Sequence, residues 1–338
     1  MGTSLRDLRD LLTGKRTFNI GRPLADRAPH PNAHRPDWQQ ASPAWIDKAL
    51  EHALAKPGGG WFVLDGADKI GDGPAKYTVL GEELVVWRDR GRVHAAPAAC
   101  PHMGADLSEG CLKDGRLACP WHDLTLGPEG HGAWAPLPVH DDGVLVWVQM
   151  ESAGESPTPV PIQAPRPRTY LSGVIRMEGA CEAQDVVANR LDPWHGAHYH
   201  PHSFTRLQLL EQTLDKITVR VAYRVVGPIE VLVDASFHSP DPRSIVMTIE
   251  DGDGSGSLVA THATPIEPGR SAVIEATIAS SDRPGFEYAV QWGQSITRHF
   301  IEQRAAKLWV EDLAYAERRY ALRQRAGGNG RRRLSVIG

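Results

Sequence analysis

The sequence has few cysteines and no long apolar run, and these two features argue against a disulfide-stabilised fold and against a membrane-spanning helix. Four cysteines among 338 residues are too few for a disulfide scaffold. The most apolar stretch, around 144–148, is far shorter than the roughly 20 residues that a membrane-spanning helix needs. Residues 1–12 have neither the apolar core nor the cleavage site of a secretory signal. We therefore expect a cytoplasmic protein without a membrane span.

The chain also has no large excess of charge of either sign. Its formal net charge is −4, and its 23% charged and 41% hydrophobic residues are ordinary for a soluble globular protein. The three consecutive arginines at 331–333 follow a glycine-rich segment, which we interpret as part of a solvated tail. Nothing in this charge pattern predicts a nucleic-acid partner or binding to a membrane surface.

The length is sufficient for two cores, and the composition divides the chain into five parts. Ser42 and Pro43 predict a helix start, with Ser42 as the N-cap, and the glycines after Pro57 predict the end of that helix. The predicted parts are an N-terminal extension with a helix (1–58), a small all-β domain (59–150), a proline-rich linker (151–168), a larger domain (169–326) and a disordered tail (327–338).

Alternating apolar residues and turn residues predict the strands of both domains. In the small domain, Asp-Gly pairs at 65–66, 114–115 and 142–143 are typical of turns, and the predicted strands are 61–65, 76–80, 83–89, 92–97, 115–118 and 143–149. The larger domain has a predicted strand at 170–177, a helix at 183–191, alternating segments at 207–226, 229–238, 244–250, 257–263 and 271–280, and a helical stretch at 286–325. The predicted fold class is α+β, with a curved antiparallel sheet flanked by helices in the larger domain.

Two cysteine-histidine pairs stand out in the small domain. Cys100 is followed by His102 after one residue, and Cys119 is followed by His122 after two. Each pair supplies one thiolate and one imidazole from a strand-to-turn junction, and this is the ligand set of a Rieske [2Fe-2S] cluster. A structural zinc site also uses Cys and His, but its paired ligands are usually separated by at least two residues.

On these residues, the chain resembles the Rieske family. Respiratory Rieske proteins carry two further cysteines that bridge the cluster loops, and this sequence has Ala105 and Trp121 at those positions. The resemblance therefore implies the oxygenase or ferredoxin branch. One departure is that oxygenases usually follow the second histidine with Gly-Trp, whereas this chain has Asp123 and Leu124.

A second set of histidines lies in the larger domain, where a Rieske ferredoxin would already have ended. His195, His198, His200 and His202 are crowded after Asp192. Helical spacing favours His195 with His198 as a ligand pair, because residues three apart share a helix face. A hydrogen-bonded histidine loop without metal is the alternative interpretation.

The resemblance to Rieske non-haem iron oxygenases selects among these residues. The family pattern implies that His195, His200 and Asp312 hold a mononuclear Fe(II), with Asp312 identified by the sequence Glu311-Asp312 followed by Glu317. It implies that Asp192 links this site to a Rieske histidine of a neighbouring subunit, in a head-to-tail homotrimer. Asn189 is expected to line the iron pocket.

The activity implied by the resemblance is O₂-dependent hydroxylation of a hydrophobic substrate, either terpenoid or carotenoid-like or aromatic. The electrons would come from NAD(P)H through a separate ferredoxin or flavin reductase, because the chain has no dinucleotide-binding fingerprint. The rival hypothesis is a Rieske electron-transfer or ligand-binding protein without a catalytic mononuclear iron.

Overall fold

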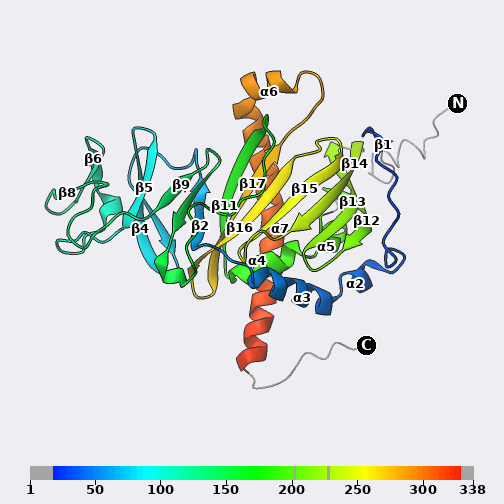
Figure 1. The fold of residues 1–338 in the computed structure, drawn as a ribbon, viewed down its shortest axis with the longest axis horizontal. Coiled ribbons are helices and arrows are strands. Elements are labelled where there is room, and N and C mark those ends of the chain that lie inside the picture. Colours follow the sequence, from blue (N-terminus) through cyan, green and yellow to red (C-terminus); the bar gives the residue numbers. More distant parts are fainter. Residues whose placement is uncertain (1–17, 201–202, 227–228, 329–338) are drawn as a thin grey trace.

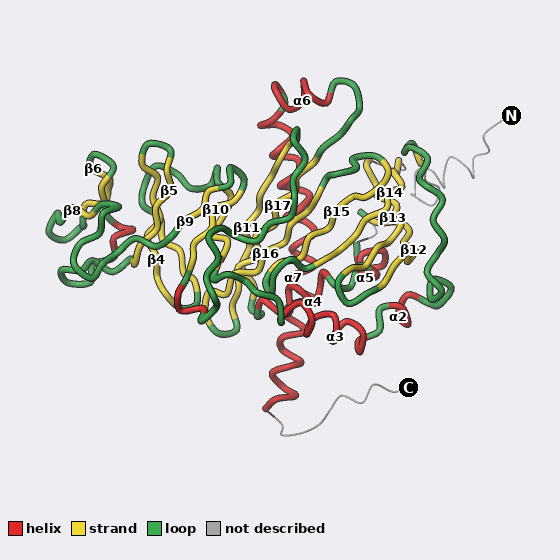
Figure 2. The backbone as a smooth tube through the Cα atoms, viewed as in Figure 1, coloured by secondary structure: helices red, strands yellow, loops and turns green. Residues whose placement is uncertain are grey.

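A computed structural model describes residues 18–200, 203–226 and 229–328, and it shows two β-rich bodies side by side along the long axis of the molecule (Figure 1). The first body contains three small sheets, and the second is built on one large antiparallel sheet. Figure 2 shows strands in both bodies and the main helices on the second. The predicted α+β class and the order of the two bodies are confirmed.

The three sheets of the first body are each three-stranded, in the orders β2-β10-β9, β3-β4-β5 and β6-β7-β8. Their strands are β2 (Trp61–Gly66), β3 (Ala75–Val79), β4 (Glu82–Asp89), β5 (Arg92–Pro97), β6 (Cys111–Lys113), β7 (Arg116–Ala118), β8 (Thr125–Leu126), β9 (Val139–Asp141) and β10 (Leu145–Gln149). The Asp-Gly pairs at 114–115 and 142–143 lie between strands as predicted, but Asp65 and Gly66 lie inside β2, so the predicted turn there is wrong.

The large sheet of the second body has the order β11-β17-β16-β15-β14-β13-β12. Its strands are β11 (Leu171–Gly179), β12 (Phe204–Gln212), β13 (Lys216–Val226), β14 (Ile229–His238), β15 (Ser244–Gly252), β16 (Leu258–Glu267) and β17 (Arg270–Ala279). The predicted segment 207–226 is therefore a hairpin of two strands, closed by bonds between Thr213 and Lys216. A short strand, β1 (Phe18–Asn19), pairs with β14 in the parallel sense and was not predicted.

The helices gather on the second body, and the longest crosses it from end to end (Figure 1). They are α2 (Asp37–Gln40), α3 (Pro43–Leu54), α4 (Ala183–Arg190), α5 (Trp194–Tyr199), α6 (Phe286–Trp292) and α7 (Gln294–Gly328). The predicted helical stretch 286–325 is thus broken at Gly293, and Gly327 and Gly328 belong to α7 rather than to a tail. Among the described residues, no helix is long and apolar enough to cross a membrane.

Helix α7 lies close to the sheet because a glycine leaves room for it. A Cβ atom at Gly179 of β11 would lie 2.6 Å from Leu313 Cδ2, which is too short for real contacts. Leu313 and Trp309 of α7 are buried in a cluster with Val273 of β17. Asp312 precedes Leu313 on α7 and is also buried. The packing of Leu313 and Trp309 therefore holds Asp312 over the interior of the second body.

The helix of the N-terminal extension packs against the second body. Ile46 and Leu50 of α3 are buried in the same cluster as Leu191 and Trp194, which precede His195 in the chain. Ser42 occupies the N-cap position of α3 as predicted, but its side chain makes no capping hydrogen bond. Helix α3 of the N-terminal extension therefore supports the segment that contains His195 and His200.

Candidate metal centres

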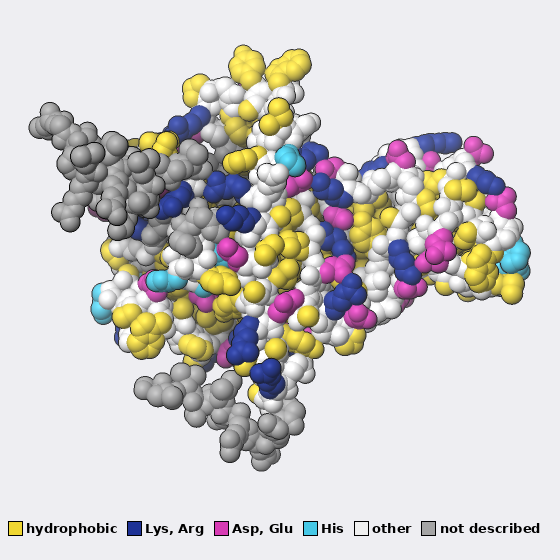
Figure 3. Space-filling model, turned by 180° about the vertical axis from the view of Figure 1, so that it is seen from behind, with side chains coloured by type: hydrophobic (Ala, Val, Ile, Leu, Met, Phe, Trp, Pro, Cys, Tyr) yellow, Lys and Arg dark blue, Asp and Glu magenta, His cyan; other side chains and the backbone are white. Residues whose placement is uncertain are grey.

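The two cysteine-histidine pairs come together at the free end of the first body. Cys100 follows β5 and Cys119 follows β7, and both side chains are buried. His102 and His122 are exposed, and their ring centroids are 4.9 Å apart with the planes at 78°. Figure 3 shows histidine and hydrophobic side chains together at this tip of the molecule.

The two loops are built alike. Gly104 N–H donates to Cys100 O (2.8 Å), and Asp123 N–H donates to Cys119 O (3.0 Å). Both turning residues are left-handed, with φ of 77° at Gly104 and 61° at Asp123. Asp tolerates this conformation better than most residues, and Lys113 Nζ pairs with the Asp123 carboxylate at 2.5 Å. Asp123, which stands where oxygenases usually have Gly, thus adopts the same left-handed turn as Gly104 in the other loop.

The loops also fit an anionic cluster. Backbone N–H groups are directed at both cysteine sulfurs, where they would stabilise negative charge. The donors at Cys100 belong to His102 and Met103, and those at Cys119 belong to Trp121 and His122. Two buried thiols and two exposed imidazoles with this backbone cradle suit a [2Fe-2S] cluster of the Rieske type.

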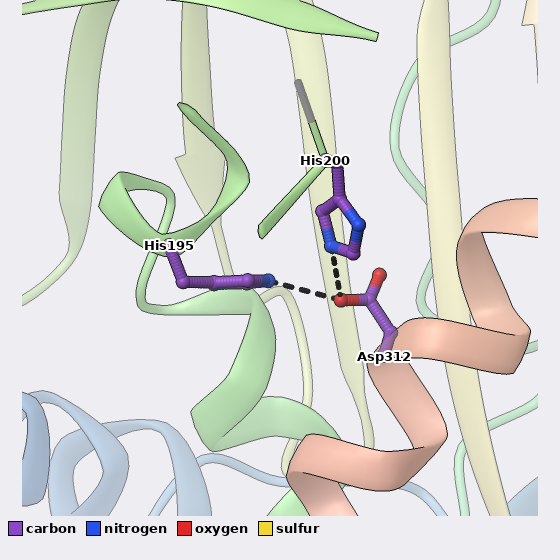
Figure 4. Close-up of side chains that lie close together, drawn as sticks. All are labelled: His195, His200 and Asp312. Carbon is purple, nitrogen blue, oxygen red and sulfur yellow. Dashed lines mark hydrogen bonds and ion pairs between the residues drawn. The ribbon is translucent and has the colours of Figure 1, made fainter. Parts of the chain in front are cut away.

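The second candidate centre lies in the second body, where three side chains converge (Figure 4). His195 Nε2 and His200 Nε2 are each 2.9 Å from Asp312 Oδ1. His195 is on α5, His200 is the residue that ends α5, and Asp312 is on α7. Donor atoms of all three lie within 4.8 Å of one another. Two imidazoles and one carboxylate with room on one side suit a mononuclear Fe(II) that binds O₂.

The other ring nitrogen of each histidine is bound to an oxygen, and this fixes the orientation of the ring. His195 Nδ1 bonds the backbone carbonyl of Asp192. His200 Nδ1 bonds Glu311 Oε2 at 2.5 Å. Burial acts to raise the pKa of Asp312, but the hydrogen bonds from both histidines outweigh it and hold that pKa well below its usual range. The carboxylate is therefore present as the anion that a cation requires.

The remaining predicted site residues surround this group. Asn189 Nδ2 donates to Asp312 Oδ1 (3.1 Å), while the buried Asn189 Oδ1 has no hydrogen-bond partner in the described chain. Asp192 is buried, burial raises its pKa, and its Oδ2 is 3.4 Å from the hydroxyl of Tyr315. Tyr315 was not predicted, although it stands three residues after Asp312 on the same helix face.

His198 does not belong to the group of converging side chains. Its side chain is 70% exposed, and its Nε2 bonds Asp37 Oδ2 at 2.8 Å. The helical-spacing alternative therefore does not describe the geometry, because α5 ends at His200 and the chain turns there. His202 lies outside the described residues.

A cavity of about 230 Å³ opens beside the histidines and Asp312. Its walls are mainly apolar side chains from the sheet and from α7, including Val219, Phe237, Val259, Phe300 and Leu308. Five polar side chains that the sequence did not single out also reach it: Arg190, Tyr223, Glu275, Thr277 and Arg304. Glu275 was detectable as one acidic residue within the apolar alternation of β17.

Comparison with known families assigns both bodies. The model described as "Rieske [2Fe-2S] domain" matches residues 60–148, and the one described as "Domain of unknown function (DUF5914)" matches residues 152–327. The chain belongs to the DUF5914 family and carries a Rieske [2Fe-2S] domain. The resemblance to the Rieske family is thereby confirmed.

Curated relatives of this DUF5914 protein include oxygenase components. It is 41% identical over 75 residues to the vanillate O-demethylase oxygenase subunit of Pseudomonas sp. (strain HR199 / DSM 7063), covering 22% of this chain and 21% of the relative. It is 31% identical over 165 residues to a 3-ketosteroid-9-alpha-monooxygenase oxygenase component of Rhodococcus rhodochrous, covering 42% of each. The chain thus spans less than half the length of these relatives.

Solved structures extend the likeness to most of the chain. Dicamba monooxygenase bound to dicamba matches with a TM-score of 0.62 and 17% identity, over 82% of this chain and 92% of that one. The terminal oxygenase of carbazole 1,9a-dioxygenase from Nocardioides aromaticivorans IC177 matches with a TM-score of 0.56 and 16% identity, over 88% and 94%. The DUF5914 protein therefore has the fold of Rieske oxygenase components.

Proposed function

We propose that this protein is the oxygenase component of a multicomponent system that hydroxylates a hydrophobic organic substrate with O₂. The observation that carries the proposal is the convergence of His195, His200 and Asp312 at an apolar cavity, in a chain with a Rieske domain. An electron carrier has no use for such a cavity beside a metal-binding group. The proposal also includes a division of the chain at 58, 150 and 168, with the larger domain ending at the end of α7, Gly328, and a cytoplasmic location.

Cys100, His102, Cys119 and His122 would hold the [2Fe-2S] cluster, and His195, His200 and Asp312 would hold Fe(II). When bound, the cluster would supply single electrons and the Fe(II) would bind and activate O₂. The donor sets fit both groups. The buried thiols accept backbone N–H groups, and the two imidazole Nε2 atoms point at one carboxylate oxygen.

The chain's own residues would position and protect this chemistry. Glu311 and the carbonyl of Asp192 keep the Nε2 atoms of His200 and His195 directed inward. Asn189 Nδ2 donates to Asp312 Oδ1 and lies 3.5 Å from His195 Nε2, so it helps to hold the carboxylate beside the histidines. The apolar cavity walls exclude water, which would compete for a metal position and for reactive oxygen.

The position of the two candidate centres supports a head-to-tail homotrimer. In Figure 1 the strands β6 and β8, which flank the cysteine loops, lie at one end of the long axis, and α5 lies in the other body. An electron would therefore pass from the Rieske domain of one subunit to the histidines of the next. Asp192, buried between His195 and Tyr315, is the residue that we assign to this junction.

Electrons would reach the Rieske domain from a ferredoxin or a flavin reductase that oxidises NAD(P)H. His102 and His122 are both exposed, and we assign to this partner the edge of whichever histidine does not face Asp192 of the next subunit. The size of the cavity bears on the substrate: a cavity of about 150 Å³ accommodates benzene, so about 230 Å³ encloses roughly nine or ten heavy atoms. One or two rings fit this space, and a carotenoid-like molecule would enter with one end only.

Iron counting separates this proposal from a Rieske electron carrier. Anaerobically reconstituted protein should hold about three irons per chain, two in the cluster and one at the mononuclear site. The Asp312→Ala variant should lose one iron and keep the visible spectrum of the cluster. Glu302→Ala, an acidic residue of the same helix that pairs with Lys69 at the surface, is the matched control and should keep all three. A wild type that holds only two irons and shows no substrate-dependent O₂ uptake would be a carrier.

A further inference from the structure

Tyr223 and Arg190 present hydrogen-bond donors in a cavity whose lining is mainly apolar. Tyr223 of β13 lies in the wall, and its hydroxyl bonds only the thioether sulfur of Met247 at 2.9 Å among the described residues. A thioether is a weak acceptor, so the hydroxyl remains able to donate to a better one. Burial raises the pKa of Tyr223, so the hydroxyl keeps its proton at any physiological pH.

Arg190 adds a second donor to the lining, and its charge acts on the Tyr223 hydroxyl. Its Nε donates to Thr261 Oγ1 (3.1 Å), and its Nη2 donates to Glu275 Oε2 (2.6 Å). Its third nitrogen, Nη1, has no hydrogen-bond acceptor within the described chain and lies 3.9 Å from Asp312 Oδ2. This nitrogen is therefore a donor close to the metal-binding carboxylate.

The charge of Arg190 is balanced, and Arg304, the other arginine of the lining, donates to the backbone carbonyl of Arg224 and lies over the ring of Phe300. Arg190 is paired with Glu275, which is buried and also accepts from Trp309 Nε1 at 2.6 Å. A substrate carboxylate at this wall would lie near two buried carboxylates, those of Glu275 and Asp312. An uncharged oxygen acceptor meets the two donors without this repulsion.

We propose that Tyr223 and Arg190 bind an uncharged acceptor oxygen, a carbonyl or a hydroxyl, of an otherwise apolar substrate. This contact fixes which carbon of the substrate faces the histidines and Asp312. The inference rests on the proposed oxygenase function, and it names the substrate class as small neutral ring compounds with one oxygen function. A site built to donate a hydrogen bond discriminates strongly against an analogue that lacks the acceptor.

The test compares three ligands with one two-ring skeleton of the size that the cavity encloses: 2-indanone, indane and indane-2-carboxylate. Their affinities for the anaerobic, iron-loaded full chain are measured by calorimetry. 2-Indanone should bind at least tenfold more tightly than either of the others. Tyr223→Phe should weaken 2-indanone at least fivefold and leave indane unchanged. Tyr288→Phe, at a side chain that is 71% exposed, is the matched control and should change neither affinity.

Any one of four results would overturn the inference. They are equal affinities of 2-indanone and indane, tightest binding of the carboxylate, no binding of any of the three ligands, and an affinity ratio of 2-indanone to indane that is the same in Tyr223→Phe as in the wild type. The comparison of ligands on the wild type does not depend on how a variant folds. Binding is measured without turnover, so its outcome is separate from the proposed function, which fails on iron content and O₂ uptake. A selective ketone site in a protein without mononuclear iron would leave this inference standing and refute only the oxygenase proposal.

Discussion

Replacement of Glu275 by Gln tests whether the buried Arg190–Glu275 pair supports the candidate iron site. The Glu275 side chain is 4% exposed, and Oε2 accepts from Arg190, Trp309 and Thr261 at 2.6, 2.6 and 3.1 Å. Gln keeps a carbonyl acceptor but removes the charge, which leaves the guanidinium of Arg190 with only the more distant Asp312 carboxylate, at 3.9 Å, as a counterion. Breaking a buried pair on one side costs about 3–5 kcal/mol, and the retained carbonyl bond recovers about 1 kcal/mol.

We therefore expect Glu275→Gln to lower the free energy of unfolding by about 3 kcal/mol. Urea titration of the metal-free protein measures this as a lower midpoint at unchanged slope. Glu178→Gln is the control, because Glu178 pairs with Arg176 and Arg270 at the surface, where loss of an ion pair costs below about 1 kcal/mol. A Glu275→Gln protein within about 0.5 kcal/mol of wild type would refute the reasoning, since the pair would then be dispensable.

The other predictions concern single contacts. His200→Ala should lose one iron per chain and His198→Ala none, because His198 is exposed and bonds only Asp37 among the described contacts; iron analysis of the purified variants decides this, and equal losses would contradict it. Gln40→Ala should lower the free energy of unfolding by about 1–3 kcal/mol, measured in urea, because buried Trp194 Nε1 loses its acceptor at 3.1 Å; an unchanged midpoint would contradict that. Burial lowers the pKa of His262 from 6.5 to about 3. Below pH 6.5 the unfolded chain therefore binds more protons than the folded protein, and the free energy of unfolding decreases as the pH is lowered. The free energy of unfolding should be about 2 kcal/mol lower at pH 5, and this decrease should be absent in His262→Asn. If the free energy of unfolding changes with pH in the same way in both proteins, the prediction is wrong.

Much of the sheet could be predicted from the sequence because alternation of apolar residues survives in each strand. The hairpin of β12 and β13 was missed because the turn between them has neither Gly nor Pro, and Thr213 and Lys216 close it instead. The break at Gly293 was missed because polar residues on both sides are equally helix-prone. Local patterns thus predict elements better than they predict the boundaries between them.

The candidate iron site could not be derived from spacing alone. Asp312 lies 117 positions after His195, and only the family resemblance connected them. Helical spacing favoured His198, but α5 is only six residues long, and the chain leaves the helix before His200. The donors at the cavity wall were missed for a similar reason: Arg190 and Tyr223 come from different elements that only the fold brings together.

The rate at which O₂ oxidises the reduced Rieske cluster tests the central proposal most directly. Fully reduced, iron-loaded protein is mixed with O₂ in a stopped-flow instrument, and the cluster absorbance is followed in wild type and in Asp312→Ala. If electrons leave the cluster through the site of His195, His200 and Asp312, reoxidation in Asp312→Ala should be at least tenfold slower. Equal rates in the two proteins would mean that O₂ reacts at the cluster itself, and they would contradict the proposed oxygenase.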